Sequence, residues 1–281
     1  MSLRISYNNF YVVSMTSIKK WETLTLADDF IFCRVLTNEE VCKALLEQML
    51  NIKIDHLEYL QSQQTIDVTL ASKGIRLDVY VKDSTRVFDI EMQKINTLDL
   101  PKRARYYQSM IDVNIIHKGE SYTSLKESYV IFICLEDPFC IGLSCYHFDY
   151  TCLENPELLL NDMAHKVFYN VSSYDKEKNP EVKAFLRLLA EGKPETKLTT
   201  KMKDLVKETL HNESWRTKYM TVEMLMVEEK QAGIKIGLEQ GRKAGVEEGF
   251  IETAKNMKNV NIDIATISLC TGLSIEEIEK L

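Results

Sequence analysis

The sequence lacks the features that mark membrane proteins, secreted proteins and proteins that coat nucleic acids. It has no apolar run near the roughly 20 residues that a membrane span needs. Its amino terminus lacks the basic start, apolar middle and small-residue cleavage site of a signal peptide. It also lacks an excess of basic charge, because the net charge is −7 at pH 7. These absences predict a cytoplasmic protein with no membrane contact, in which any contact with nucleic acid comes from a local basic patch.

The cysteines do not form a disulfide framework. There are seven, an odd number, and no Cys-x-x-Cys pair. We therefore expect most of them to be reduced, small and buried. One cluster of zinc-type ligands, Cys140, Cys145, His147 and Cys152, leaves a zinc site open as an alternative. The four-residue gap between Cys140 and Cys145, and the alternation of residue types from Cys145 to Phe148, favour a strand over a metal knuckle.

Residues 75–94 predict two short strands joined by a tight turn. Apolar and polar side chains alternate along both halves, as in half-buried strands, with the turn centred on residues 84–85. This register puts Asp78 directly across from Glu91 and places Asp89 on the same polar face. Directly opposed like charges are destabilising, so something should compensate for them.

The usual compensation for converging carboxylates is a hard divalent cation such as Mg²⁺, held by oxygen ligands and shared with a substrate phosphate. The alternative is that Asp78 and Glu91 are ordinary solvated strand carboxylates. The residues by themselves leave both interpretations open.

The arrangement resembles a known nuclease core. It is similar to the PD-(D/E)xK core, in which an Asp on one strand is followed by a Glu on the next, then one spacer, a polar residue and a helix. The resemblance is to the recombination-promoting nuclease (Rpn), or transposase-like, family, in which glutamine replaces the final lysine, as in Glu91-Met92-Gln93. It covers roughly residues 22–172, and further motifs follow in order at residues 101–108, 119–122 and 128–134.

The resemblance implies an α/β fold with a restriction-endonuclease-like core, a mixed sheet flanked by helices. It implies a metal-dependent endodeoxyribonuclease that hydrolyses DNA phosphodiester bonds and serves mobile elements or genome defence. Asp78 and Glu91 would hold Mg²⁺, with Mn²⁺ or Ca²⁺ as alternatives, the Met92 backbone carbonyl would be a third ligand, and Gln93 would orient the attacking water. The competing interpretation is a weakly active or inactive nuclease-fold module that binds DNA or proteins through its carboxyl-terminal helices.

A basic patch is expected beside these carboxylates. Pro101 suits the first turn of a helix that runs to about residue 115, and Arg103 and Tyr107, four apart, share one of its faces. Cations there would hold the DNA backbone, although the same side chains could simply be solvated on a surface helix. The residues predicted to bind DNA or support the site are Arg76, Lys94, Lys102, Arg103, Arg105 and Tyr107.

The rest of the chain alternates helical and strand patterns and then becomes helical. Helices are expected at 25–36 and 39–50, where Asn38 can cap the second and where Glu39, Glu40 or Glu47 is a less favoured additional metal ligand. Strands are expected at 64–71, 128–135, 141–150 and 166–172, and helices at 181–191, 199–212 and from 214 onward. The predicted organisation is an N-terminal extension (1–21), a nuclease-like domain (22–175), a helical region (176–232), a glycine-repeat helix or linker (233–250) and a small helical hairpin (251–281).

Glycine recurs every fourth residue from Gly233 to Gly249, and these five are half of the ten glycines in the chain. In a helix each step of four advances about 40° beyond a full turn, so the glycines would trace a smooth ridge. Five interior glycines cost about 4–5 kcal/mol relative to alanine. The pattern predicts either close packing against another helix, as in a homo-oligomer, or a partly frayed linker.

The last segment, residues 262–281, predicts two short helices around Gly272, the second opened by a capping box from Ser274 to Glu277. It resembles half of a helix-turn-helix. Its second helix is acidic and would repel DNA phosphates, so we expect it to contact protein.

Overall fold

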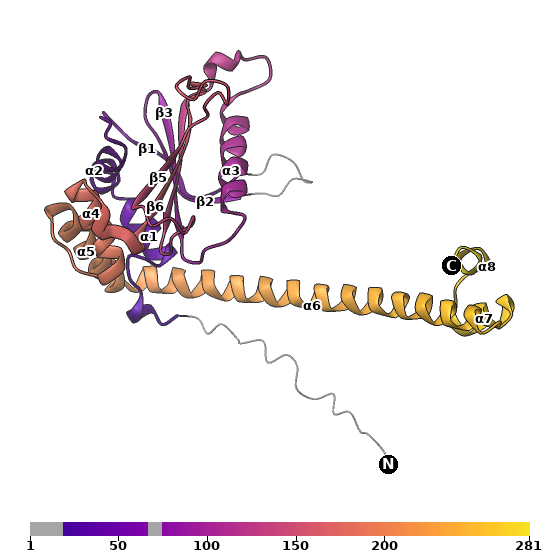
Figure 1. The fold of residues 1–281 in the computed structure, drawn as a ribbon. Coiled ribbons are helices and arrows are strands. Elements are labelled where there is room, and N and C mark those ends of the chain that lie inside the picture. The colour runs from indigo at the N-terminus through magenta and orange to yellow at the C-terminus, as the bar shows by residue number, and fades with distance from the viewer. Residues whose placement is uncertain (1–18, 67–74) are drawn as a thin grey trace. The chain divides into compact units, whose positions relative to one another are not determined.

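The computed structural model describes residues 19–66 and 75–281, with the side chains of 60–77 and 229 outside the description (Figure 1). The chain divides into two compact units, one up to Arg216 and one from Thr217 to Leu281. Among the described helices, none combines the length and the apolar character needed to cross a membrane.

A six-stranded mixed sheet, in the order β1-β2-β3-β4-β6-β5, forms the centre of the first unit. Strands β3, β4 and β6 run parallel, and the other pairs are antiparallel. Strand β4 is central and buried from Val130 to Cys134, as expected for an apolar run covered on both faces. The strands are β1 Glu58–Ile66, β2 Ile75–Lys82, β3 Arg86–Gln93, β4 Glu127–Cys134, β5 Cys145–Phe148 and β6 Ala164–Asn170.

Helices cover both faces of this sheet, which confirms the predicted fold class. Helix α3 (Leu100–Ile115) lies on one face, and α1 (Asp29–Leu36), α2 (Glu39–Leu50), α4 (Pro180–Glu191) and α5 (Lys197–Leu210) gather on the other side (Figure 1). Pro101 falls in the first turn of α3, and the Asn38 side chain accepts a hydrogen bond from the Val41 N–H at the start of α2, both as predicted. The described part of this unit also contains three short 3-10 turns, Trp21–Thr23, Tyr122–Ser124 and Val171–Lys176.

The β2–β3 hairpin has the predicted register. Tyr80 pairs with Asp89 and Lys82 with Val87, which leaves residues 84–85 at the centre of the turn.

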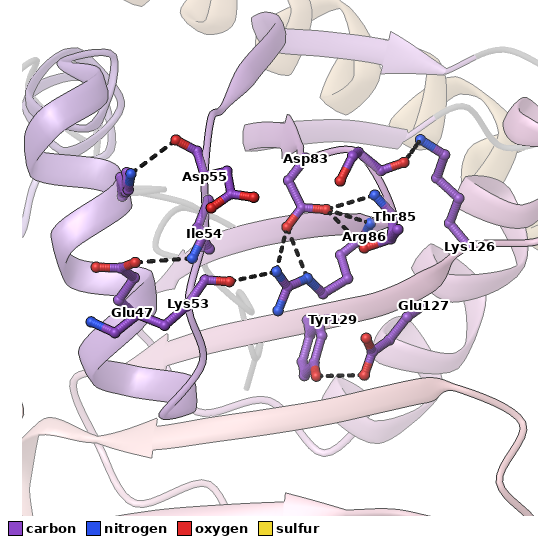
Figure 2. Close-up of polar contacts among 12 residues, drawn as sticks. Glu47, Lys53, Ile54, Asp55, Asp83, Thr85, Arg86, Lys126, Glu127 and Tyr129 are labelled. Atoms are coloured by element: carbon purple, nitrogen blue, oxygen red, sulfur yellow. Dashed lines mark hydrogen bonds and ion pairs between the residues drawn. The ribbon is translucent and has the colours of Figure 1, made fainter.

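Side-chain contacts anchor this turn to its surroundings (Figure 2). The Asp83 carboxylate accepts hydrogen bonds from the Thr85 and Arg86 N–H groups, at 2.8 and 2.6 Å, and from Arg86 Nε at 2.8 Å. Arg86 Nη2 in turn donates to the Lys53 carbonyl at 2.6 Å, and Lys126 Nζ donates to the Ser84 carbonyl at 3.1 Å. The turn that aligns Asp78 with Glu91 is therefore held by charged groups rather than by backbone pairing alone.

Two predicted strands differ from the observed ones. β1 begins at Glu58, earlier than the predicted 64–71, whose last part, 67–71, lies outside the described residues. β5 is confined to residues 145–148 because 137–144 form a loop around Asp137. The Asp137 carboxylate accepts hydrogen bonds from the N–H groups of Phe139 and Gly142, at 3.0 and 2.6 Å, which takes residues 139–142 out of the extended conformation.

The second unit consists of most of helix α6 (Glu213–Asn259) with α7 (Ile264–Thr271) and α8 (Ile275–Glu279). All five repeat glycines lie inside α6, and a Cβ added at any of them would meet no described atom within 4 Å apart from its chain neighbours and the nearby backbone of the helix itself. The end of α6 packs with α7 and α8 around Ala254, Ile267 and Ile278. The predicted capping box from Ser274 to Glu277 is confirmed.

Candidate functional site

The carboxylates of Asp78 and Glu91 meet where β2 and β3 stop pairing. The ladder runs as far as Val79 and Ile90, and beyond it side chains replace backbone partners. The Asp78 N–H donates to Glu91 Oε1 at 2.9 Å, and the Met92 N–H donates to Asp78 Oδ2 at 3.1 Å. The predicted juxtaposition of these two residues is confirmed, at a point where the sheet opens.

Asp89 is a third carboxylate on this face, as its place in the predicted register indicates, and the sequence pattern assigned it no role. Its side chain is fully buried, and neither carboxyl oxygen receives a hydrogen bond from a described N–H or hydroxyl donor. It lies against the Glu91 carboxyl, and a hydrogen bond between two carboxyl groups requires a proton on one of them. The sequence signal was its position two residues before Glu91, which puts both on one face of β3.

Burial and neighbouring negative charge raise the pKa of both Asp89 and Glu91. Burial is the largest cause for Asp89, and the Asp78 charge raises its pKa further, against the lowering effects of the hydrogen bond with Glu91 and of the Arg103 charge. Burial also raises the pKa of Glu91, followed by the charges of Asp89 and Asp78. The site therefore holds carboxyl groups whose charged forms are disfavoured in a poorly solvated place, and a bound cation would favour those charged forms.

Helix α3 brings one cation to this site. Arg103 Nη1 donates to Gln93 Oε1 at 2.7 Å, and Nη2 donates to the Tyr107 hydroxyl at 3.2 Å. The guanidinium lies over the rings of Tyr107 and Phe132, 5.5 Å from each centroid. Burial alone would lower the pKa of Arg103, but Tyr107 and the Glu91 charge raise it above its usual value. The predicted common face of Arg103 and Tyr107 is confirmed, and it points at Gln93.

The other predicted basic residues are less closely engaged. Lys94 forms ion pairs with Asp28 and Asp29 at the start of α1, at 3.6 and 3.3 Å, so part of its charge is already neutralised. Lys102 and Arg105 are exposed on α3. The side chain of Arg76 lies outside the described residues.

The less favoured metal ligands lie elsewhere. Glu47 accepts a hydrogen bond from the Ile54 N–H at 2.9 Å, Glu39 pairs with His56 at 3.0 Å, and Glu40 pairs with Lys201. All three project from α2, across the sheet from α3 (Figure 1).

Two residues of the cysteine cluster, Cys145 and His147, lie on strand β5 rather than in a metal knuckle. Cys145 Sγ and His147 Nε2 are 3.1 Å apart on β5, and Cys152 bonds to Glu154. Among the described side chains, those of residues 19–59, 78–228 and 230–281, no three from His, Cys, Asp or Glu are grouped as a metal site.

A two-carboxylate site completed by a backbone carbonyl still fits the Asp78–Glu91 region. Carboxylate and carbonyl oxygens are the ligands that Mg²⁺ prefers. The Met92 N–H points at Asp78, and because a strand residue's N–H and C=O face the same side, its carbonyl also faces the opening. Asp89, buried beside Glu91 with a raised pKa, keeps its proton more readily than an ordinary carboxyl, and a cation bound at Asp78 and Glu91 would favour the release of that proton.

The comparison with known families agrees with this geometry. The model of the PD-(D/E)XK nuclease family transposases matches residues 26–234. The chain belongs to this family. The matched span contains the whole sheet, α3 and every residue of the opening described above. Neither a curated protein nor a solved structure matches the chain.

Proposed function

We propose that this PD-(D/E)XK family member is a metal-dependent DNA endonuclease of the recombination-promoting, transposase-like type. The observation that carries the proposal is the convergence of Asp78, Asp89 and Glu91 at the point where β2 and β3 separate, with two of the three carboxyl pKa values raised. A structural role would not require three converging acids.

In this proposal Asp78 and Glu91, with the Met92 carbonyl, hold Mg²⁺ or Mn²⁺. A bound divalent cation lowers the pKa of the attacking water and offsets charge that builds on the phosphate. A cation bound there would favour the charged form of Asp89, and the charge of Asp89 would then strengthen the hold on the cation.

Gln93 and Arg103 divide the tasks that one lysine performs elsewhere. An amide can donate and accept hydrogen bonds but carries no charge. Gln93 Oε1 accepts from Arg103 and keeps a second lone pair that can orient a water, while its Nε2 donates to the Ile95 carbonyl. Arg103 supplies the positive charge. Lys102 and Arg105, on the same helix, would contact the DNA backbone together with Arg76 and Lys94.

Cleavage of supercoiled and linear DNA in Mg²⁺, Mn²⁺, Ca²⁺ or EDTA tests the proposal. The variants should be Asp78→Asn and Glu91→Gln, because each amide oxygen can still accept the backbone hydrogen bond that its carboxylate accepts now. Glu157→Gln, at an exposed position, is the matched control.

We expect cutting in Mg²⁺ or Mn²⁺, none in EDTA, and a loss beyond about 100-fold in both site variants, because even residues that only support metal ligands are worth 10–100-fold. Equal activity of wild type and both folded variants would contradict the assigned site. No cutting by any of them, with DNA binding retained, would favour the alternative of a nuclease-fold binding module. The observation that favours this alternative is that both the oxygen and the nitrogen of the Gln93 amide already form hydrogen bonds within the protein.

A further inference from the structure

A second feature of the α3-covered face is a pocket of about 370 Å³ at the edge of the sheet, which we call the aromatic pocket. It lies between the first turns of α3 and strands β5 and β6. Four aromatic rings and two basic side chains characterise its lining: Phe139, Phe148, Tyr150, Phe168, Arg105 and Lys166.

The aromatic pocket and the carboxylates share one face of the sheet. Glu91 pairs with Phe132 on β4, which pairs with Phe168 on β6, so all three side chains point to the same side. Two strand spacings separate Glu91 from Phe168, roughly 10 Å. The rings of Phe132 and Phe168 stack at 5.5 Å, and Arg103 lies over Phe132. A continuous row of contacts thus joins the candidate active site to the pocket.

The rings at the mouth of the pocket are unusually exposed. Phe148 is 45% exposed and Tyr150 is 50% exposed. Phe148 is held edge-on against Phe168 at 5.6 Å, and Phe139 packs against Phe168 at 5.2 Å. The inner rings therefore fix the position of Phe148 while part of its surface stays open to a ligand.

The charges around the pocket suit an anionic ligand with a flat ring. Lys166 Nζ lies 4.9 Å from the centroid of Tyr150, and Arg105 is exposed beside it on α3. One acid, Asp149, also lines the pocket, but its carboxylate is bound to His165 Nδ1 at 2.7 Å. Aromatic faces with adjacent cations are the way in which proteins bind the bases and phosphates of single strands.

The size of the pocket restricts the ligand further. Small-molecule pockets range from about 300 to 1,000 Å³, so this one is near the lower limit and suits a single base rather than a peptide helix. A base inside a duplex keeps both faces stacked and cannot offer one to a protein ring. The ligand must be unpaired or turned out of the helix.

We propose that the aromatic pocket binds one unpaired nucleobase of the DNA strand, within about three nucleotides of the phosphate at the Asp78–Glu91 site. The spacing follows from roughly 10 Å between the two places and about 3.4 Å per stacked nucleotide. The proposal rests on the proposed nuclease function, and it adds that the substrate has a single-stranded or distorted segment beside the cut.

Fluorescence anisotropy in EDTA tests binding without cutting. The probes are a labelled single strand, the same sequence as a blunt duplex, and a set of single strands with one abasic position moved along the sequence. The variants are Tyr150→Ala, Phe148→Leu, which keeps an apolar side chain on β5, and Lys166→Gln. Tyr122→Ala, a tyrosine that is 84% exposed outside the pocket, is the matched control.

We expect the wild type to bind the single strand at least about 10-fold more tightly than the duplex, and Tyr150→Ala to lose about 5- to 100-fold of single-strand affinity. One abasic position should weaken single-strand binding by the wild type by a similar factor. The same abasic strand should bind Tyr150→Ala no more weakly than the intact strand does, which would show that the Tyr150 ring contacts a base. Lys166→Gln should reduce the slope of log affinity against log salt by about 0.7. The Tyr122→Ala control should bind as the wild type does.

Equal wild-type affinity for intact and abasic strands would overturn the proposal, as would unchanged single-strand affinity in both Tyr150→Ala and Phe148→Leu. A change confined to self-association, measured by sedimentation velocity, would also overturn it and assign the pocket to a second copy of the chain. Cleavage assays on the same proteins in Mg²⁺ separate the two proposals. If the protein cuts DNA normally while Tyr150→Ala and Phe148→Leu leave single-strand affinity unchanged, only the base-pocket proposal is refuted. If the protein binds the base but does not cut, only the nuclease proposal is refuted.

Discussion

At the scale of single residues, the most informative group is Asp89, a fully buried carboxyl on β3 that receives no hydrogen bond from a described N–H or hydroxyl group. Its raised pKa means that the folded state holds a proton that the unfolded chain has already released. The folded protein should therefore lose stability as the pH rises from about 4, the ordinary carboxyl pKa, through the raised value.

Asp89→Asn should remove this penalty. In EDTA at pH 8 we expect the free energy of unfolding to rise by about 1–3 kcal/mol over wild type, because an amide of the same shape carries neither a buried charge nor the cost of keeping a proton at that pH. The advantage should shrink toward zero near pH 4, where the wild-type carboxyl is protonated in both states. Urea unfolding across that range is the measurement, with the exposed Asp175→Asn as control. A pH-independent difference would contradict the assigned titration.

The Gln93–Arg103 pair gives a second prediction at this scale. Gln93→Lys restores the lysine of the PD-(D/E)xK pattern but places an ammonium where Arg103 Nη1 now donates at 2.7 Å. We expect this variant to lose on the order of 1–3 kcal/mol of stability through like-charge repulsion and to cut no faster than wild type. The double variant Gln93→Lys/Arg103→Gln should recover most of the stability and cut faster than either single variant.

Urea unfolding and single-turnover cleavage complete this double-mutant cycle. The stability readout does not depend on activity, so it remains informative even for an inactive wild type. Strictly additive effects would show that the two side chains act independently, against the geometry.

At the scale of elements, the β2–β3 hairpin depends on its turn. Burial raises the pKa of Asp83, but the N–H groups of Thr85 and Arg86 and the Arg86 guanidinium outweigh that effect, and the net shift is downward. The charged form therefore stabilises the fold above the ordinary pKa near 3.9, and the contribution is lost as the pH falls through the lowered folded value.

Asp83→Asn should cost about 1–3 kcal/mol at pH 7, because it weakens several hydrogen bonds to a charged acceptor. The cost should diminish below about pH 4, the opposite pH dependence to that of Asp89→Asn. Unfolding in urea at several pH values measures both trends on the same hairpin. A cost that persisted unchanged at pH 2 would mean that the Asp83 charge contributes nothing.

Local patterns predicted the hairpin and its register, because alternation and turn chemistry are properties of adjacent residues. The helix starts at Asn38 and Pro101 were predictable for the same reason. The burial of Asp89 was not, since it depends on α3 lying across the sheet. The pairing of Lys94 with Asp28 and the assembly of the aromatic pocket from α3, β5 and β6 are likewise contacts between distant segments, which periodicity does not encode.

At the scale of the whole molecule, the two units have separate cores. The core of the second unit is small and centres on Ala254, Ile267 and Ile278, all fully buried. We expect Ile267→Ala to cost about 2–4 kcal/mol within this unit, through lost burial and the cavity left behind.

Hydrogen exchange measured by mass spectrometry should then show lost protection in residues 254–281 and unchanged protection in strands β3 and β4. Ile275→Ala, at a position that is 53% exposed, is the matched control. Loss of protection in the sheet would contradict the separation between this small core and that of the first unit.

The glycine spacing in α6 also bears on how the gene can change. Four residues are twelve bases, so the gain or loss of one glycine-led unit preserves the reading frame. Each such event would move α7 and α8 by roughly 6 Å along the helix axis and turn them by about 40°, leaving the glycine ridge continuous. Because no described side chain packs where these glycines lie, the helix can change length in these steps without disturbing the core at its end.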